Sequence, residues 1–416
     1  MKELDADIVV FGAGIAGLWT FHTLKQLGYN AVLLEADSIG SGQTVASQGI
    51  IHSGLKYVFS GKINALARSI SEMPDRWRKA MRGEGLVDLS SAEKMASSQY
   101  LLIPHGRMTG FLELLTKKTL GRSVQTIPPD EWPDAIRQSG FKGSAIYMDE
   151  PVLDPKTVAR ALAEPFRDSI RKIDWPDSVR FQQTDTGAIE KIILNDNTSI
   201  CPKHVIFTAA GGNEVIAGQL GHDKGLQTQH RPLLMPMVKN APFKLHAHCV
   251  GTSDKPVVTI TSHKDKDGGV VWYLGGRVSE RPLDADREEL FKDARKILEK
   301  YLPEADLRQS EWAALPINRV EGKRSNHKKL PDTPVLHTHE NVAYGWPTKL
   351  TFAPFLADKI MKNIEELNIK PGNRKTDWSF LPKAHMTTEP WNKDIWTEHT
   401  CTTPSPNTEN SLAKRV

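Results

Sequence analysis

Three glycines near the N-terminus have the residue type and spacing of a phosphate-binding turn. Gly12, Gly14 and Gly17 directly follow an apolar run at residues 7–11, and apolar residues at helical spacing come after them. In such a turn the first glycine allows a tight bend, the second lets backbone approach a pyrophosphate, and the third lets helix and strand pack closely. The helix also directs the positive end of its dipole at the phosphates. The segment therefore predicts a dinucleotide site.

A carboxylate at the end of the next predicted strand fits the same site. The apolar run 31–35 ends in Glu35, and it completes a strand–helix–strand unit of about 30 residues, which implies parallel strands. At this position Glu35 can accept hydrogen bonds from an adenosine ribose, and its charge disfavours the ribose phosphate of NADP. NAD and FAD are both compatible with the unit.

The segment that follows favours FAD by resemblance. Residues 40–57 are small, polar and glycine-rich, and they resemble the flavin-contacting loop of the FAD-dependent oxidoreductases related to D-amino-acid oxidase. The run Gln-Gly-Ile-Ile-His-Ser-Gly-Leu-Lys-Tyr at 48–57 is similar to the corresponding run of glycerol-3-phosphate dehydrogenases and L-2-hydroxyglutarate dehydrogenases. The resemblance implies that FAD is the cofactor.

Two later segments occur in the order that this resemblance requires. Residues 205–213 resemble the strand ending in Ala-Gly that closes over the cofactor, and residues 341–354 resemble the last strand, glycine turn and helix, whose N-terminus faces the flavin pyrimidine. The second turn departs from the usual Gly-His-Gly form, because it contains Trp346-Pro347 and is shorter. It leaves open which of its residues contact the flavin. The cofactor-binding residues predicted in total are Gly12, Gly14, Ile15, Ala16, Gly17, Glu35, Gly42, Gln43, Thr44, Gln48, Gly49, Ala210, Gly211, Gly345, Lys349, Leu350 and Thr351.

His52 is the first candidate for proton transfer, because its loop is expected to run beside the flavin. Oxidation of a hydroxyl group requires removal of its proton as hydride leaves carbon, and imidazole titrates in the right range for this task. The alternative is that His52 only positions the cofactor.

Arg324 is the first candidate for binding an anionic group of the substrate. Residues 322–324, Gly-Lys-Arg, precede a Pro-Asp pair, which resembles a family segment whose arginine faces a substrate carboxylate. Arg319 is the alternative, and either arginine could instead be a surface ion-pair partner. Weaker candidates are Tyr273 and Arg277, which would share one face of a strand over 270–277.

The histidines do not predict a metal site. His246 and His248 would share one face of a strand while Cys249 points away, and no acidic ligand is near them in sequence. His337 and His339 are interpreted as loop or strand-edge residues.

The resemblance implies an α/β fold, α+β overall, in which a Rossmann-like FAD-binding domain is interleaved with an antiparallel-sheet substrate domain. The FAD-binding domain would comprise 1–75, 150–225 and 325–370, and the substrate domain 76–149 and 226–324, followed by a C-terminal extension at 371–416. Strands are expected at 231–238, 244–250, 257–263 and 270–277, and a helix at 285–301.

Composition excludes several other classes of protein. The 416 residues contain 54 Lys and Arg against 50 Asp and Glu, a dispersed excess that does not indicate nucleic-acid binding. The three cysteines form no CxxC pair, which favours a reducing compartment. No apolar run approaches the ~18–20 residues of a transmembrane segment, and acidic residues near the N-terminus argue against an export signal. We expect a soluble, cytoplasmic protein.

These inferences together predict an FAD-dependent oxidoreductase, either a dehydrogenase or an oxidase. A small anionic hydroxyl substrate, a 2-hydroxy acid or a polyol phosphate, would give a hydride to flavin N5, and oxygen, a quinone or another carrier would reoxidise the flavin. An amino acid or amine is the alternative substrate. Two further alternatives are an NAD-linked dehydrogenase and a non-catalytic flavin-binding protein.

Overall fold

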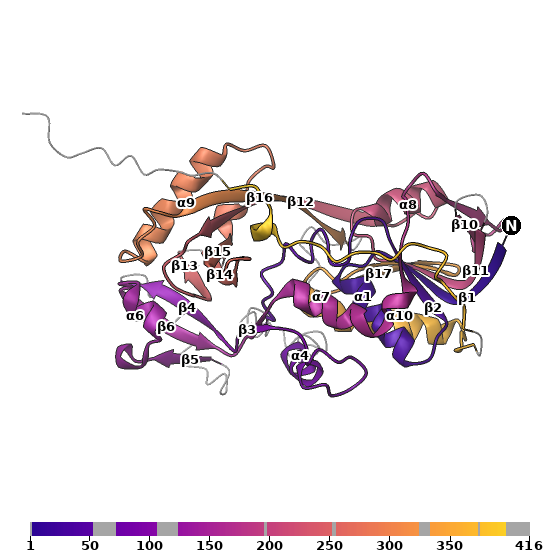
Figure 1. Ribbon diagram of the computed structural model, residues 1–416, viewed down its shortest axis with the longest axis horizontal. Helices are drawn as coiled ribbons and strands as arrows, with labels where there is room; N and C mark the ends of the chain where they lie inside the picture. The colour runs from indigo at the N-terminus through magenta and orange to yellow at the C-terminus, as the bar shows by residue number, and fades with distance from the viewer. Residues whose placement is uncertain are drawn as a thin grey trace, which may run out of the picture.

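Two sheets organise the part of the chain that the structure describes. The computed structural model describes residues 2–52, 72–105, 124–194, 198–251, 255–323, 333–372 and 375–396. Within these ranges, sheet 1 is the sheet that contains β1 (Lys2–Phe11), and sheet 2 is the sheet that contains β12 (Gln227–Lys239). The two sheets lie in the two halves of the molecule (Figure 1). A short ladder pairs β3 (Lys94–Ala96) with β7 (Val152–Leu153) between them.

Sheet 1 contains the predicted strand–helix–strand unit. Its central strand β1 pairs in parallel with β2 and with β11, and β11 pairs in parallel with β18. Because the carboxyl ends of parallel strands meet at one edge, the residues that follow these strands come together there. The strands of sheet 1 are β1 (Lys2–Phe11), β2 (Ala31–Glu35), β8 (Ile170–Lys172), β9 (Val179–Gln183), β10 (Ile189–Leu194), β11 (Thr198–Phe207), β17 (Val335–His339) and β18 (Val342–Trp346).

Both faces of sheet 1 are covered, which explains why the end of β1, residues 8–11, is apolar. Ile8 and Val10 point to a core formed with α1 (Ile15–Gln26), α7 (Pro155–Ala163) and α10 (Ala353–Glu366). Val9 and Phe11 point to the opposite core, which includes residues of α8 (Gly212–Leu220). Alternate side chains of a strand point to opposite faces, so a strand between two layers needs apolar residues throughout.

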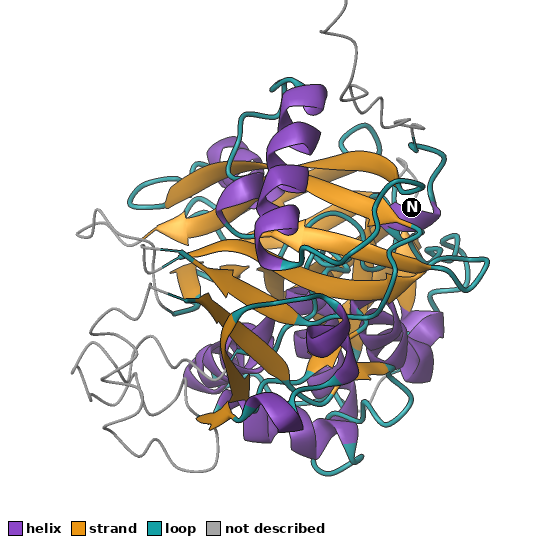
Figure 2. Cartoon of the chain, turned by 90° about the vertical axis from the view of Figure 1, so that its left-hand side faces the viewer, coloured by secondary structure: helices purple, strands orange, loops and turns teal. Residues whose placement is uncertain are grey.

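Sheet 2 is built on a long antiparallel pair. β12 and β16 pair from Gln227 with Lys323 to Lys239 with Glu311, and they extend from one half of the molecule towards the other (Figure 1). The helix α9 (Arg287–Tyr301) packs on this sheet through Leu290 and Leu298, and Figure 2 shows the sheet from this side. The strands of sheet 2 are β4 (Gln99–Pro104), β5 (Val124–Ile127), β6 (Gly143–Met148), β12 (Gln227–Lys239), β13 (Ala247–Val250), β14 (Pro256–Lys264), β15 (Val270–Gly275) and β16 (Glu311–Lys323).

The other described helical segments are each nine residues long or shorter. They are α4 (Met73–Met81), α6 (Asp134–Gln138) and the 3₁₀ turns η2 (Pro129–Glu131), η3 (Glu164–Ser169), η4 (Arg277–Ser279), η5 (Leu350–Phe352) and η6 (Pro390–Asn392). After α10, Trp378 packs into the core of sheet 1 and Trp391 packs with Met235 and Tyr273 of sheet 2, so the end of the described chain contacts both sheets. None of the described helices has the length and apolar character needed to cross a bilayer.

Two details of sheet 2 differ from the sequence predictions. The sheet is mixed, because β13 pairs in parallel with β4, which comes from an earlier part of the chain. The strand predicted over 270–277 ends at Gly275, and Arg277 begins a 3₁₀ turn. The reason is Gly276, whose φ of +86° breaks the strand. The prediction that Tyr273 and Arg277 share a strand face was therefore wrong.

The N-cap of α7 provides a test of the fold. Asp154 accepts a hydrogen bond from Thr157 N–H at 2.7 Å, and Pro155 occupies the first helical position. We expect Asp154→Ala to lower the free energy of unfolding by about 1 kcal/mol in urea denaturation. The matched control is Asp286→Ala at the exposed cap of α9, which accepts from Glu288 N–H at 2.8 Å. It should cost less, and an unchanged urea midpoint for Asp154→Ala would contradict the assigned cap.

Candidate functional site

The glycine turn between β1 and α1 is enforced by packing. Gly12 has a φ of +96°, and a Cβ there would lie 2.9 Å from the carbonyl oxygen of Thr208. A Cβ on Gly17 would lie 1.9 Å from the carbonyl oxygen of Gly12. Gly14 caps α1 without a side chain, and the Ile15 N–H donates to Thr44 Oγ1 at 2.9 Å. Gly14 thus adds no side chain of its own at the N-terminus of α1, where an anion is expected.

Glu35 fastens the turn to the end of β2. Its carboxylate accepts hydrogen bonds from the N–H groups of Ala13 at 2.5 Å and Asp37 at 2.6 Å. Burial raises the pKa of Glu35 above its ordinary value, while these two hydrogen bonds act in the opposite direction. A carboxylate has about four acceptor positions, so Glu35 can also accept from a ribose hydroxyl.

The second glycine junction, after β11, lies under β16. Ala210 has a φ of +51°, and its carbonyl accepts a hydrogen bond from Trp346 Nε1 at 3.0 Å. Gly211 caps α8, and a Cβ there would lie 3.3 Å from Val320 Cγ2. Small residues at this junction therefore allow a long strand to pass over the edge where the cofactor is expected.

The loop after β2 connects the glycine turn to sheet 2. Gln48 Nε2 donates to the carbonyls of Thr259 and Tyr273, both at 3.0 Å. Gly49 has a φ of +69°, and a Cβ there would lie 1.8 Å from the carbonyl oxygen of Leu153. Gln43 Nε2 is 3.5 Å from the carbonyl oxygen of Val320. Gly42, in the same loop, has a φ of +63°, and a Cβ there would have no atom within 4 Å.

The turn before α10 reaches back to the same loop. Thr351 is buried, and its Oγ1 accepts from His52 N–H at 3.2 Å and donates to the Ile50 carbonyl at 3.3 Å. Gly345 lies within β18, where a Cβ would be 3.2 Å from Leu356 Cδ2, so this glycine allows α10 to pack on the strand. The predicted residues Lys349 and Leu350 lie in the turn itself, with Lys349 Nζ 5.7 Å from the ring centroid of Phe352.

His52 lies in a cluster that the sequence did not predict. Its Nδ1 is 3.3 Å from Glu150 Oε2, and its ring faces that of His248 with 6.1 Å between centroids. Glu150 and His248 are buried, whereas the His52 side chain is 41% exposed. Cys249 lies in the core of sheet 2, where burial raises the pKa of its thiol. Burial lowers the pKa of His246 to about 4, so that histidine is neutral at ordinary pH.

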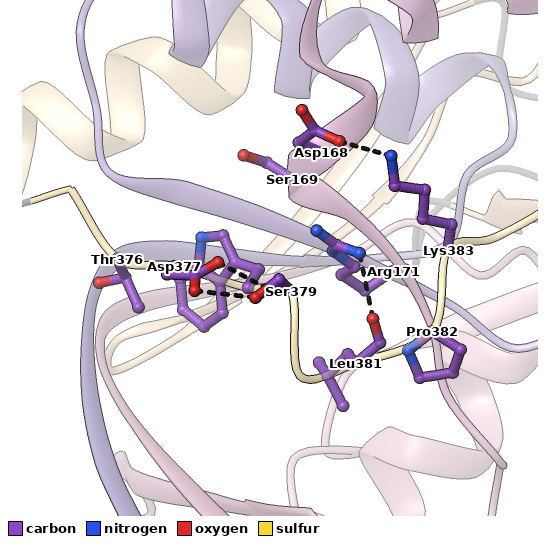
Figure 3. Close-up of a pocket in the computed structure, with 10 residues that line it drawn as sticks. Asp168, Ser169, Arg171, Thr376, Asp377, Ser379, Leu381, Pro382 and Lys383 are labelled. Atoms are coloured by element: carbon purple, nitrogen blue, oxygen red, sulfur yellow. Dashed lines mark hydrogen bonds and ion pairs between the residues drawn. The ribbon is translucent and has the colours of Figure 1, made fainter.

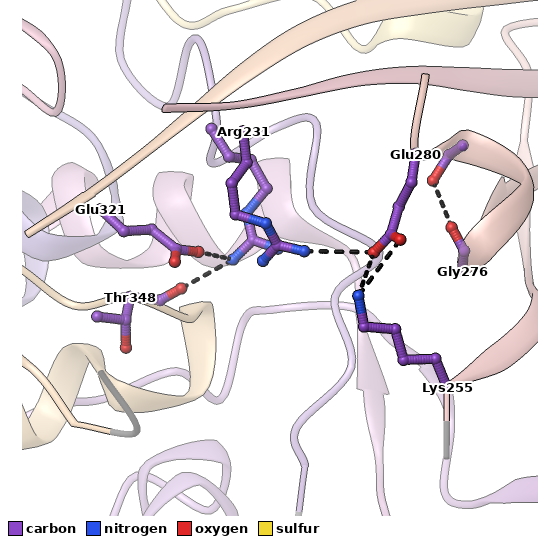
Figure 4. Close-up of polar contacts among 8 residues, drawn as sticks. Arg231, Lys255, Gly276, Glu280, Glu321 and Thr348 are labelled. Carbon is purple, nitrogen blue, oxygen red and sulfur yellow. Dashed lines mark hydrogen bonds and ion pairs between the residues drawn. The ribbon is translucent and has the colours of Figure 1, made fainter. Parts of the chain in front are cut away.

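Of the predicted anion-binding residues, Arg319 and Tyr273 have other partners, Arg277 is exposed, and Arg324 lies outside the described residues. Arg319 donates to Glu321 and to the Thr348 carbonyl, the latter at 2.9 Å (Figure 4). This contact clamps the turn before α10. Tyr273 is buried and its hydroxyl donates to the Ala46 carbonyl at 2.8 Å, while Arg277 is exposed. Arg324 and residues 53–57 lie outside the described residues.

A pocket lies at the edge of sheet 1, beside β8, away from the residues described above (Figure 3). Its charged groups already have partners: Arg171 donates to the Leu381 carbonyl at 3.0 Å, and Asp168 pairs with Lys383 at 2.7 Å. The pocket contains none of the residues predicted to bind cofactor or substrate. We therefore take the glycine turn and His52 as the candidate site.

The glycine turn fits the pyrophosphate of a dinucleotide. Gly14 leaves its backbone uncovered by a side chain at the N-terminus of a helix whose first turn contains no acidic residue. Glu35 stands at the end of the neighbouring parallel strand, where the ribose is expected. The residues that would hold the two groups therefore lie at the same edge of sheet 1.

Known proteins share both the sequence and this fold. The family described as FAD dependent oxidoreductase matches residues 7–358. A probable FAD-dependent oxidoreductase of Pseudomonas aeruginosa is 36% identical over 94% of this chain and 98% of its own length. Its crystal structure superposes with a TM-score of 0.80 at 33% identity, covering 94% of this chain and 98% of that one.

More distant solved structures share the fold. Glycine oxidase from Geobacillus kaustophilus gives a TM-score of 0.62 at 14% identity, over 92% of this chain and 100% of its own. L-α-glycerophosphate oxidase from Mycoplasma pneumoniae, solved with FAD bound, gives 0.60 at 14% identity, over 89% and 97%. The family match and the similarity to the Pseudomonas protein confirm the resemblance on which FAD was preferred to NAD. The chain belongs to the family of FAD-dependent oxidoreductases, and FAD is its cofactor.

Proposed function

We propose that this enzyme oxidises a small anionic hydroxyl compound, a 2-hydroxy acid or a polyol phosphate. The observation that carries the proposal is the contact between His52 and the buried carboxylate of Glu150, at 3.3 Å. A histidine held by a carboxylate is suited to accept the proton of a hydroxyl group. Its position beside Thr351, just before α10, supports a location close to the flavin.

His52 and Glu150 have different roles in the proposed proton removal. FAD, when bound, would supply the hydride acceptor for the reaction. The Glu150 carboxylate accepts the hydrogen on Nδ1 of His52, so the neutral ring keeps a lone pair on Nε2. That lone pair accepts the hydroxyl proton, and the imidazolium that forms is stabilised by the adjacent carboxylate. Gln99, which is buried, donates to Glu150 Oε2 at 3.4 Å and helps to hold the carboxylate.

The domain limits expected from the sequence are part of this proposal. Sheet 1 would form the core of the FAD-binding domain, made of 1–75, 150–225 and 325–370, and sheet 2 the core of the substrate domain, made of 76–149 and 226–324. Gln48 supports a site between the two, because it extends from the loop after β2 to β14 and β15. Oxygen, a quinone or another carrier would reoxidise the flavin.

An amino acid is the alternative substrate. The similarity to glycine oxidase concerns the fold alone, and a neutral histidine can also accept a proton from an ammonium group. Anaerobic mixing of the purified holoenzyme with 2-hydroxy acids, glycerol 3-phosphate and amino acids separates the two classes. Bleaching of the flavin by a hydroxyl compound is expected. Bleaching by amino acids alone would refute the proposed substrate class.

Glu35→Gln should weaken FAD binding without unfolding the protein. The amide keeps only one oxygen for the two N–H donors of Ala13 and Asp37, and it loses the charge that strengthens a ribose hydrogen bond. We expect a loss of roughly 1–3 kcal/mol in FAD binding, measured by titration of the apoprotein. Asp37→Asn is the control, because Asp37 contributes its backbone N–H to this contact. An unchanged dissociation constant for Glu35→Gln would place the ribose elsewhere.

His52→Ala should slow flavin reduction at saturating substrate. Removal of a general base costs roughly 100- to 10,000-fold in rate, and flavin content should be retained. Stopped-flow absorbance under anaerobic conditions measures the rate. The exposed His230 serves as control, because His230→Ala removes an imidazole that pairs with exposed Glu214. Loss of bound flavin in His52→Ala would instead assign His52 to cofactor positioning.

Arg324→Lys should raise the substrate concentration needed for half-maximal flavin reduction, with FAD still bound. Lysine keeps the charge but lacks the planar fork that binds a carboxylate through two hydrogen bonds. Arg319→Lys is the matched comparison. It should lower the melting temperature and leave substrate affinity unchanged, because Arg319 clamps Glu321 and Thr348. The reverse pattern would transfer the anion-binding role to Arg319.

A further inference from the structure

Three side chains from distant parts of the chain meet at His52. His52 follows the loop after β2, Glu150 precedes β7, and His248 lies on β13. One donor atom from each lies within 4.8 Å of the other two. We call these residues the His–Glu–His cluster. Two imidazoles and one carboxylate form a donor set that zinc and related divalent transition metals bind in proteins.

The distances in the cluster suit such an ion. Zinc binds nitrogen and carboxylate oxygen at about 2.0–2.2 Å in tetrahedral geometry, which places neighbouring donor atoms roughly 3.3 Å apart. The distance between His52 Nδ1 and Glu150 Oε2 is 3.3 Å. All donor atoms of the cluster lie within 4.8 Å of one another, so binding an ion requires a donor pair to move closer by at most about 1.5 Å.

Neighbouring residues hold the three donors in place. His248 Nδ1 is 2.8 Å from Thr259 Oγ1, a contact that fixes the orientation of the ring. Gln99 Nε2 contacts Glu150 Oε2 at 3.4 Å, and the backbone N–H of His52 donates to Thr351 Oγ1 at 3.2 Å. Contacts of this kind orient ligands in metal sites and contribute to affinity.

The burial of the cluster also favours a cation. Glu150 is 4% exposed, and a divalent ion would place positive charge directly against its carboxylate. The His52 side chain is 41% exposed, so an ion can enter from that side. Three protein ligands with one open side are typical of zinc sites that keep an exchangeable fourth position.

We propose that His52, Glu150 and His248 form a binding site for a divalent transition-metal ion, with Zn²⁺ as the best fit. Metal on Nδ1 of His52 leaves the ring hydrogen on Nε2, so this nitrogen no longer has a lone pair for a substrate proton. A bound ion therefore inhibits oxidation. This consequence, unlike the binding site itself, rests on the proposed role of His52 as base.

Binding is tested on the full-length holoenzyme after removal of metal by a chelator. Isothermal titration with Zn²⁺ should give one ion per chain. Glu150→Gln and His248→Gln should each weaken binding about a hundredfold or more. The matched control is His230→Gln, which removes an exposed histidine that lies 3.2 Å from Glu214 and should leave affinity unchanged. Equal Zn²⁺ affinity in the wild type and both cluster variants would overturn the proposal.

The wild-type protein provides a measurement that needs no variant. Crystals soaked in Zn²⁺ should show an anomalous difference peak at the zinc edge among His52, Glu150 and His248. The rings of His222 and His339 have centroids 4.1 Å apart and offer a competing location. A peak there, with none at the cluster, would refute the assignment even if both cluster variants failed to fold.

Inhibition is measured separately, with the substrate that bleaches the flavin. Saturating Zn²⁺ should slow anaerobic flavin reduction at least tenfold in the wild type and in His230→Gln. Zinc bound at the cluster without slower reduction would support the metal site and contradict the role of His52 as base. The failure of the proposed function is thereby distinguished from the failure of the metal site.

Discussion

The close contact between the start of α1 and the end of β1 is the constraint on which the rest of the structure depends. A Cβ on Gly17 would lie 1.9 Å from the Gly12 carbonyl oxygen, and a Cβ on Gly12 would lie 2.9 Å from that of Thr208. The turn therefore joins two strands and a helix at distances that only glycine allows. The same contact places the helix N-terminus beside Glu35, so the groups proposed to bind the phosphates and the ribose are fixed together.

The loop after β2 connects the glycine turn, at the edge of sheet 1, to sheet 2. Gln48 reaches β14 and β15, and Gly49 lies against the backbone of β7. The position of His52 follows from these contacts, because the chain between Gly49 and His52 runs beside residues 150–152: the Ile51 N–H donates to the Pro151 carbonyl at 2.9 Å. The pairing of His52 with Glu150 is thus a consequence of how the loop is attached.

Sequence patterns predicted the parts of the molecule that depend on nearby residues. The strand–helix–strand unit, the strand β14 and the helix α9 are each specified within one or two elements. The end of β15 was missed, although the pair Gly275-Gly276 gave a signal for it. His52 and Glu150 are 98 residues apart, and no local pattern relates them. Their contact depends on a pairing between distant segments, the β-bridge of Ile50 with Val152.

The third member of the cluster changes what the other two can do. The carboxylate of Glu150 alone is sufficient to orient His52 as a base. With only these two donors, however, a metal ion would be held weakly and would exchange readily. His248 adds a third donor from sheet 2, on a strand that is parallel to β4, and β4 also carries Gln99, which contacts Glu150. The strand pairing that brings Gln99 to the carboxylate, and so supports the proposed proton transfer, therefore also brings the second imidazole to it. Catalysis and metal binding would then compete for one nitrogen atom of His52.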